Sequence, residues 1–187
     1  MSEKKNALEK KKEQYEELNR IASPAGVVFF GNEVFCEMDF SELAGSFGLS
    51  EPIYNRSLAH VLPEEIPAYL DACIVGLHPK KVFLEVGSEE ENGRDPGETM
   101  ERLEWLLYTV HQKTGAKIWL VCTAGREGRG ETAERFRALA AEYGCGFVDI
   151  SAALRHPRAE LKIFEQLKPF IRLNGIGFFE AMNPVVG

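Results

Sequence analysis

The sequence predicts an α/β fold in which helices cover both faces of a parallel sheet. Short apolar runs alternate with amphipathic helical patterns along its 187 residues. The strand candidates are apolar at consecutive positions, which is typical of strands buried on both faces of a parallel sheet. The length suffices for one domain with a sizeable core. We therefore expect a three-layer α/β/α sandwich with a five-stranded parallel sheet and right-handed crossovers.

The N-terminal segment, residues 3–22, predicts a highly charged helix with a narrow apolar stripe. The stripe consists of Leu8, Tyr15, Leu18 and Ala22. Its heptad-like spacing favours packing on the rest of the domain, or else against a partner helix. We assign residues 1–24 to this helix and residues 25–187 to a single domain.

Five apolar runs and three helical patterns define the rest of the expected fold. The strand candidates are residues 27–30, 52–54, 81–86, 117–122 and 146–150. The helical patterns are residues 63–75, 100–110 and 133–143. Pro63 lies near the start of the first pattern, where proline fits a helix. This alternation of strands and helices supports the layered arrangement.

Composition excludes several classes of function. The formal net charge of −7 argues against a nucleic-acid-binding protein, because phosphate neutralisation needs a basic face. It also argues against docking on an anionic membrane. We find neither a secretory leader nor an apolar stretch as long as a membrane span, and expect a cytoplasmic protein. The cysteines, which form no C-x-x-C pair, are expected to be reduced thiols: Cys36, Cys73, Cys122 and Cys145.

Two strand candidates run into similar glycine turns. Gly31-Asn32-Glu33 follows the first strand, and Gly87-Ser88-Glu89 follows the third. Ligands of open α/β sheets bind beyond the carboxyl ends of the strands. If the two parent strands are neighbours, Glu33 and Glu89 therefore project into one crevice.

Several segments, in order along the chain, resemble the blocks of the SGNH (GDSL) hydrolases. The first turn resembles the strand-turn that ends Gly-Asp-Ser and carries the nucleophilic serine. The second resembles the Gly-x-Asn-Asp turn that carries an oxyanion-hole asparagine. Further likenesses lie at residues 53–57, 78–84, 144–150 and 171–178. The resemblance is to a bacterial branch that begins with a helix, and it implies a flavodoxin-like strand order.

The resemblance also identifies family active-site positions, and their residue types have changed. In the family a serine attacks an ester, a histidine takes its proton and an aspartate orients the histidine. The positions of the serine, the oxyanion-hole glycine and asparagine, the aspartate and the histidine are here Glu33, Ser57, Glu89, Pro169 and Arg172. Arginine cannot act as a base near neutral pH, and a glutamate would repel a developing oxyanion. The resemblance thus implies a pseudoenzyme that has lost ester hydrolysis.

Two non-enzymatic uses of such a site are open. In the first, a Glu33–Arg172 salt bridge fills the old catalytic centre, because arginine suits a planar pair with a carboxylate. In the second, the crevice binds a small cationic or polyhydroxylated ligand. The ligand-binding candidates are Glu33, Asn55, Glu89, Glu90 and Arg172.

Two enzymatic alternatives are also open. Paired carboxylates could serve as general acid and base, or hold a divalent metal, although we expect neither a metal nor a cofactor. The protein could instead be an active esterase of carbohydrate or lipid esters that uses other residues. Its candidate nucleophiles and bases are Ser57, Ser88, Cys36, His60, His78, His111 and His156.

Two surfaces could support a homo-oligomer. One is the N-terminal helix, through its apolar stripe. The other is a C-terminal apolar cluster of Phe178, Phe179, Met182, Val185 and Val186, which we expect to pack on the sheet. Exposure of such a cluster in a monomer would favour an interaction surface.

Overall fold

A computed structural model describes residues 3–87, 95–124 and 130–173. The helices are α1 Glu3–Asn19, α2 Glu33–Glu37, α3 Phe40–Ser46, α4 Ile66–Cys73, η1 Val75–Leu77, α6 Pro96–Thr114, α7 Gly130–Glu142, α8 Ser151–Leu154 and α9 Ala159–Ile171. The strands are β1 Val27–Phe30, β2 Ile53–Asn55, β3 Lys81–Val86, β4 Lys117–Cys122 and β5 Gly146–Asp149. Strands and helices alternate through most of this chain, as the sequence pattern predicts.

The five strands form one parallel sheet in the order β2-β1-β3-β4-β5. This confirms both the expected five-stranded parallel sheet and its flavodoxin-like order. In the register, Val27 pairs with Ile53 on one side and with Lys81 on the other. Three of the strands have the predicted bounds, β2 is shifted by one residue at both ends, and β5 ends one residue earlier than predicted. Because β1 and β3 are neighbours, the two glycine turns follow adjacent strands.

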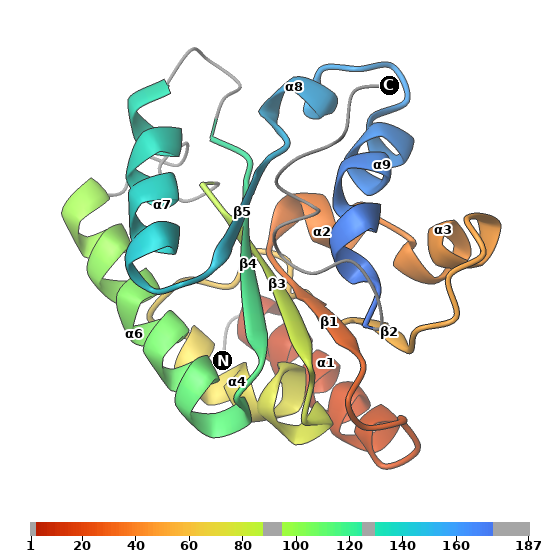
Figure 1. Cartoon of the computed structure of the whole chain (residues 1–187). Coiled ribbons are helices and arrows are strands. Elements are labelled where there is room, and N and C mark those ends of the chain that lie inside the picture. Colours follow the sequence, from red (N-terminus) through yellow and green to blue (C-terminus); the bar gives the residue numbers. More distant parts are fainter. Residues whose placement is uncertain (1–2, 88–94, 125–129, 174–187) are drawn as a thin grey trace.

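Helices cover both faces of the sheet and make three layers (Figure 1). Successive side chains of a strand point to opposite faces, so each strand contributes to two cores. Val28 and Leu84 pack with α1, α4, α6 and α7, whereas Phe29 and Phe83 pack with α2, α3, α8 and α9. Every residue of β1 is buried. Continuous burial explains why its sequence is apolar at each position.

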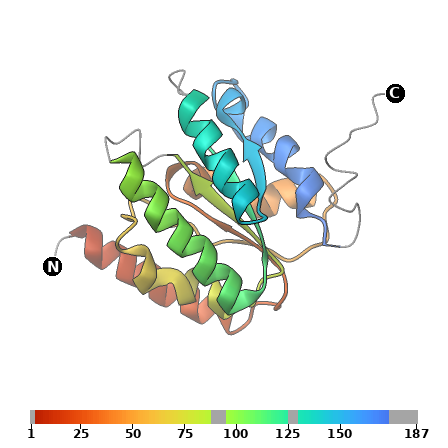
Figure 2. The ribbon, with the colours of Figure 1, turned by 60° about the vertical axis from the view of Figure 1, so that its left-hand side comes forward.

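The N-terminal helix α1 lies beside α4 on one face of the molecule (Figure 2). Leu8 and Tyr15 from its apolar stripe are buried in the core. The Tyr15 hydroxyl also donates a hydrogen bond to the carbonyl oxygen of Ser57 at 2.8 Å. The helix ends at Asn19, three residues before the end of the expected segment, and Leu18 is exposed. The charged helix is thus fixed to its own domain.

Several short helices and one long helix were not predicted from the sequence pattern. The long one, α9, precedes the segment that resembles the family's last block and buries Ile163, Phe164 and Leu167 against the sheet. Among the described residues, none of the helices is both long and apolar enough to cross a bilayer. The four cysteines are free thiols, and Cys73 and Cys122 are buried. The C-terminal apolar cluster lies outside the described residues.

Candidate functional site

The turn between β1 and α2 lies at the carboxyl edge of the sheet. Gly31 and Asn32 connect the strand to the helix, and Glu33 is the first residue of α2. The Glu33 side chain is exposed. The matching turn begins at Gly87, but Ser88, Glu89 and Glu90 lie outside the described residues. The described part of the candidate site is therefore built around the β1–α2 turn.

A carboxylate from the neighbouring strand holds this turn. Glu85 of β3 accepts hydrogen bonds from the backbone N–H groups of Asn32 at 3.1 Å, Val34 at 3.2 Å and Phe35 at 2.9 Å. The first N–H groups of a helix have no partner within the helix, and negative charge is favourable there. Glu85 is only 8% exposed. It acts as the N-terminal cap of α2 supplied from another strand.

Gly31 permits the close approach that this cap requires. A Cβ atom at Gly31 would lie 2.6 Å from the Cβ of Glu85 and 3.0 Å from the ring of Phe35. Real Cβ atoms do not sit so close to a neighbour in a well-packed core. The glycine of the turn is thus needed for packing against β3.

The other end of α2 is held by Asn55, at the end of β2. Its Nδ2 donates to the carbonyl oxygens of Phe35 at 2.6 Å and Met38 at 3.1 Å. Its Oδ1 accepts a hydrogen bond from the backbone N–H of Ser57 at 3.1 Å. Asn55 was a ligand-binding candidate in the sequence, but in the structure these bonds use most of the amide's capacity to join β2 to α2.

Asn32 ties the turn to the loop after β2. Its Oδ1 accepts a hydrogen bond from the backbone N–H of His60 at 2.6 Å, and its Nδ2 donates to Val61 O at 3.4 Å. His60 has a left-handed backbone with φ of 59°. Such a conformation is uncommon for residues other than glycine and persists where the surroundings fix it. The sequence shows an asparagine in a glycine turn, but it does not indicate that this side chain binds the backbone of His60.

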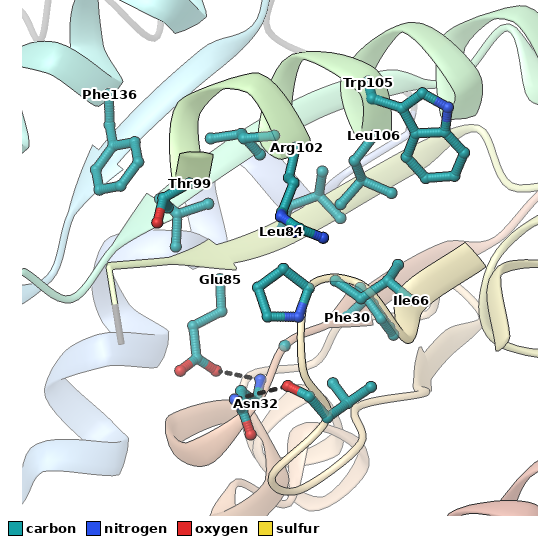
Figure 3. Close-up of a pocket in the computed structure, with 15 residues that line it drawn as sticks. Phe30, Asn32, Ile66, Leu84, Glu85, Thr99, Arg102, Trp105, Leu106 and Phe136 are labelled. Atoms are coloured by element: carbon teal, nitrogen blue, oxygen red, sulfur yellow. Dashed lines mark hydrogen bonds between the residues drawn. The ribbon is translucent and has the colours of Figure 1, made fainter. Parts of the chain in front are cut away.

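A small cavity lies beside the turn, under the first part of α6 (Figure 3). Its volume is about 50 Å³. Most of its walls are apolar, for example Phe30, Leu84 and Leu106, and Asn32 and Glu85 supply a polar side. Pockets for small organic ligands have volumes of roughly 300–1,000 Å³. This cavity has room for a few water molecules and is too small for such a ligand.

The candidate nucleophiles are not activated in the described structure. The Ser57 hydroxyl is buried and has no hydrogen-bond partner within the described part of the chain. Burial, followed by the nearby charge of Glu85, raises the pKa of the Cys36 thiol to about 12. A thiol with such a pKa is almost entirely protonated at neutral pH and is a poor nucleophile.

The four histidines do not supply a base to these groups. Among the described residues, no histidine hydrogen-bonds to a serine, threonine or cysteine side chain. His156 lies between α8 and α9, and its Nδ1 accepts a hydrogen bond from the backbone N–H of Arg158 at 3.0 Å. His78 and His111 lie before β3 and β4, toward the amino edge of the sheet. His60 contributes its backbone to the loop described above.

The sequence matches no protein-family model and no curated protein, but its fold matches solved structures. A protein from Streptococcus pneumonia that is named for platelet activating factor superimposes with a TM-score of 0.72, at 20% identity, over 88% of this chain and 92% of its own. The lipase/acylhydrolase of Enterococcus faecalis has a TM-score of 0.59 at 14% identity, over 81% of this chain and 100% of its own. This chain has the fold of the GDSL-like hydrolases.

A further neighbour extends this observation. A GDSL-like lipase from Bacteroides thetaiotaomicron has a TM-score of 0.59 at 14% identity, and the match covers 80% of this chain and 82% of that one. Structural matches at such low sequence identity establish the fold alone. They confirm the three-layer architecture expected from the sequence. They do not extend to individual active-site residues, and for these only the geometry of this chain is informative.

Within this GDSL-like fold, two of the expected site positions lie far from the β1–α2 turn. Arg172 follows α9 and is exposed, and its carbonyl oxygen accepts a hydrogen bond from Lys81, the first residue of β3. The backbone N–H of Leu173 donates to Glu51, which precedes β2. These contacts place Arg172 at the amino edge of the sheet, whereas Glu33 is at the carboxyl edge.

The expected Glu33–Arg172 salt bridge is therefore absent from the ion pairs of the described residues. Pro169 lies in the last turn of α9, at the same end of that helix as Arg172. Glu33 and Arg172 do not meet because α9 runs from the carboxyl edge of the sheet back to its amino edge. The last residues of α9 are therefore far from the β1–α2 turn. The local likeness of residues 171–178 to the family's final block gave no indication of this helix.

Proposed function

We propose that this chain is a member of the GDSL-like hydrolase family that has lost serine-based ester hydrolysis and serves as a binding protein. One observation carries the proposal. The residue that follows the β1 turn and begins α2 is Glu33, an exposed carboxylate, and the described edge around it supplies no paired hydroxyl or thiol and histidine. The fold supports membership of the GDSL-like hydrolase family, and the residues around the β1–α2 turn support the loss of ester hydrolysis.

Acyl transfer by this route requires a nucleophile within hydrogen-bond reach of a base. Glu33 offers neither a hydroxyl nor a thiol that a base could activate. The Ser57 hydroxyl is buried and has no hydrogen-bond partner among the described residues, and burial raises the pKa of the Cys36 thiol to about 12. Loss of a nucleophile and its base together lowers kcat by about a million-fold in serine hydrolases. We therefore expect no turnover of simple esters.

The expected cationic or polyhydroxylated ligand remains a proposal. Of the residues expected to bind it, Asn55 is occupied in holding α2 and Arg172 lies at the other edge, while Glu33 is exposed at the turn. Thermal-shift measurements with spermidine, a polyamine, test for a cationic ligand, and the same measurements with a disaccharide test for a polyhydroxylated one. A rise in Tm that disappears in Glu33→Ala would support this site, and unchanged Tm values would oppose it.

Hydrolysis of p-nitrophenyl acetate and butyrate tests the loss of catalysis. The wild-type protein is compared with Glu33→Ala and with Glu37→Ala, which changes another exposed glutamate of α2. We expect the buffer rate for all three proteins. Turnover that is lost in Glu33→Ala but kept in Glu37→Ala would show that Glu33 is catalytic and contradict the proposal. Turnover that survives Glu33→Ala but is abolished by a serine-directed phosphonate would favour the alternative, an active esterase of carbohydrate or lipid esters.

A further inference from the structure

A wide groove lies between α1 and the loop that follows β2. Its volume is about 710 Å³, within the range of small-molecule pockets. None of the residues that line this groove, all in the described part of the chain, is acidic. The charged ones are Lys4, Lys11 and Arg56, with His60 beside them. A basic groove on a chain whose net charge is −7 favours an anionic ligand.

Arg56 is a buried cation that has no carboxylate partner among the described residues. It is 7% exposed, and its guanidinium donates to Asn19 Oδ1 from Nε at 3.2 Å and from Nη2 at 3.1 Å. Its Nη1 makes a longer bond of 3.4 Å to the carbonyl of Asn55. No ion pair of Arg56 occurs among the described residues. A buried charge is costly unless it is paired, so an anion bound here would be favourable.

A second observation on the same wall also indicates a ligand. Ser57 lines the groove next to Arg56, and its buried hydroxyl has no partner in the described structure. A buried hydroxyl without a hydrogen bond is unfavourable by itself. At the rim, His60 has the left-handed backbone that the Asn32 side chain fixes. Strained conformations of this kind are concentrated at binding sites.

Two cations that line the groove lie against the Tyr15 ring. The guanidinium carbon of Arg56 lies 4.9 Å from the centre of the Tyr15 ring, and Lys11 Nζ lies 5.1 Å from it. Lys11 forms no ion pair among the described residues, whereas Lys4 pairs with Glu65 at 3.1 Å. Lys11 and Arg56 are therefore the two cations on which an anionic group could bind.

The groove also has an apolar side. Its apolar lining residues include Ala7, Leu8, Leu18, Leu58 and Ala59. Leu18 is 38% exposed, so the groove offers apolar surface that a ligand could cover. Charged groups on one side and apolar groups on the other fit a molecule with an anionic head and a hydrocarbon body.

We propose that this groove binds a small amphiphile with a carboxylate head, held by Arg56 and Lys11, and an apolar body against α1 and the loop after β2. A carboxylate matches the planar fork of a guanidinium. Glu33 does not line the groove, so the proposal does not depend on the loss of ester hydrolysis.

Calorimetric titration of the full chain with octanoate tests the class of ligand. Octanol carries the same chain without charge, octyltrimethylammonium carries the opposite charge, and octyl phosphate carries a different anion. We expect octanoate to bind at least roughly tenfold more tightly than octanol, since one charge-assisted hydrogen bond is worth about this factor. Equal affinity for octanoate and octanol, or no binding of octanoate, would overturn the proposal. Octyl phosphate binding tenfold more tightly than octanoate would overturn the choice of a carboxylate.

Two substitutions on α1 test the location. Lys11→Gln removes the exposed cation over Tyr15, and Lys10→Gln removes an exposed cation that does not line the groove. We expect Lys11→Gln to raise the Kd for octanoate roughly fivefold and Lys10→Gln to leave it unchanged, as interactions of an exposed ion are worth about this much. Equal effects of the two would show that binding follows overall charge and not the groove. Circular dichroism verifies that both variants are folded.

Discussion

The carboxylate oxygen Oε2 of Glu85 lies 2.9 Å from the backbone nitrogen of Phe35, 50 positions earlier in the chain. This bond joins the end of β3 to the first turn of α2. The same carboxylate also accepts hydrogen bonds from the N–H groups of Asn32 and Val34, so one side chain binds three N–H groups of the β1–α2 turn. The geometry of the candidate site therefore depends on a residue that does not belong to the turn.

Replacement of Glu85 should destabilise the protein. Glu85→Ala leaves three N–H groups at the start of α2 without this acceptor, and we expect the free energy of unfolding to fall by about 3 kcal/mol. Urea denaturation measures this difference. The exposed Glu33→Ala, in the same turn, should change it by less than about 0.5 kcal/mol. A Glu85→Ala protein as stable as wild type would show that the cap contributes nothing.

The close packing of Gly31 on Glu85 gives a second prediction. Gly31→Ala places a Cβ atom 2.6 Å from the Cβ of Glu85, and we expect a loss of about 2 kcal/mol in the free energy of unfolding. Gly45→Ala is the matched control, because Gly45 lies exposed in α3 and a Cβ there would meet no atom within 4 Å. It should stabilise the protein by about 0.5–1 kcal/mol, as alanine favours a helix. Equal effects of the two substitutions in thermal denaturation would contradict the packing argument.

Stability should fall at alkaline pH through the buried thiol of Cys73. Burial raises its pKa from 9.0 to about 12. Between these values the unfolded chain loses the thiol proton while the folded chain keeps it, so stability declines as pH rises above 9. The slope approaches about 1.4 kcal/mol per pH unit for one such group.

Urea denaturation at pH 8, 9 and 10 measures this effect by comparing wild type with Cys73→Ala. The alanine variant lacks the titrating thiol, so the stability difference between the two proteins should change with pH. All other titrating groups are shared and cancel in the comparison. A difference that is the same at the three pH values would mean that Cys73 ionises in the folded protein as in the unfolded chain.

Much of the fold could be predicted from local patterns. The apolar runs at 27–30, 81–86 and 117–122 coincide with β1, β3 and β4 because a strand covered on both faces needs an apolar residue at each position. The short helices α2 and α3 were not predicted, since five or seven residues carry little helical periodicity. The longer α9 was not predicted either, because residues 159–171 were assigned to no element. The resemblance gave the strand order correctly.

The candidate site could be predicted only in part. Glu33 lies at the expected turn, because the end of β1 is fixed by its apolar run. The prediction that Arg172 lies beside Glu33 was wrong, because the path of α9 carries Arg172 to the amino edge of the sheet. The roles of Glu85 and Asn55 were not predicted, since the groups that they bind in the β1–α2 turn and at the end of α2 are 17 to 53 residues away in the chain.

The sequence alone determined the α/β class, the main strands and the residue types at the turn, because burial and periodicity act within a few neighbouring residues. The tertiary structure decided which side chains meet. Only the register of β1 beside β3 brings Glu85 to the start of α2, and only the packing of α1 on the domain assembles Lys11, Tyr15 and Arg56 around one groove. Contacts between distant segments depend on the whole path of the chain, which no local pattern contains.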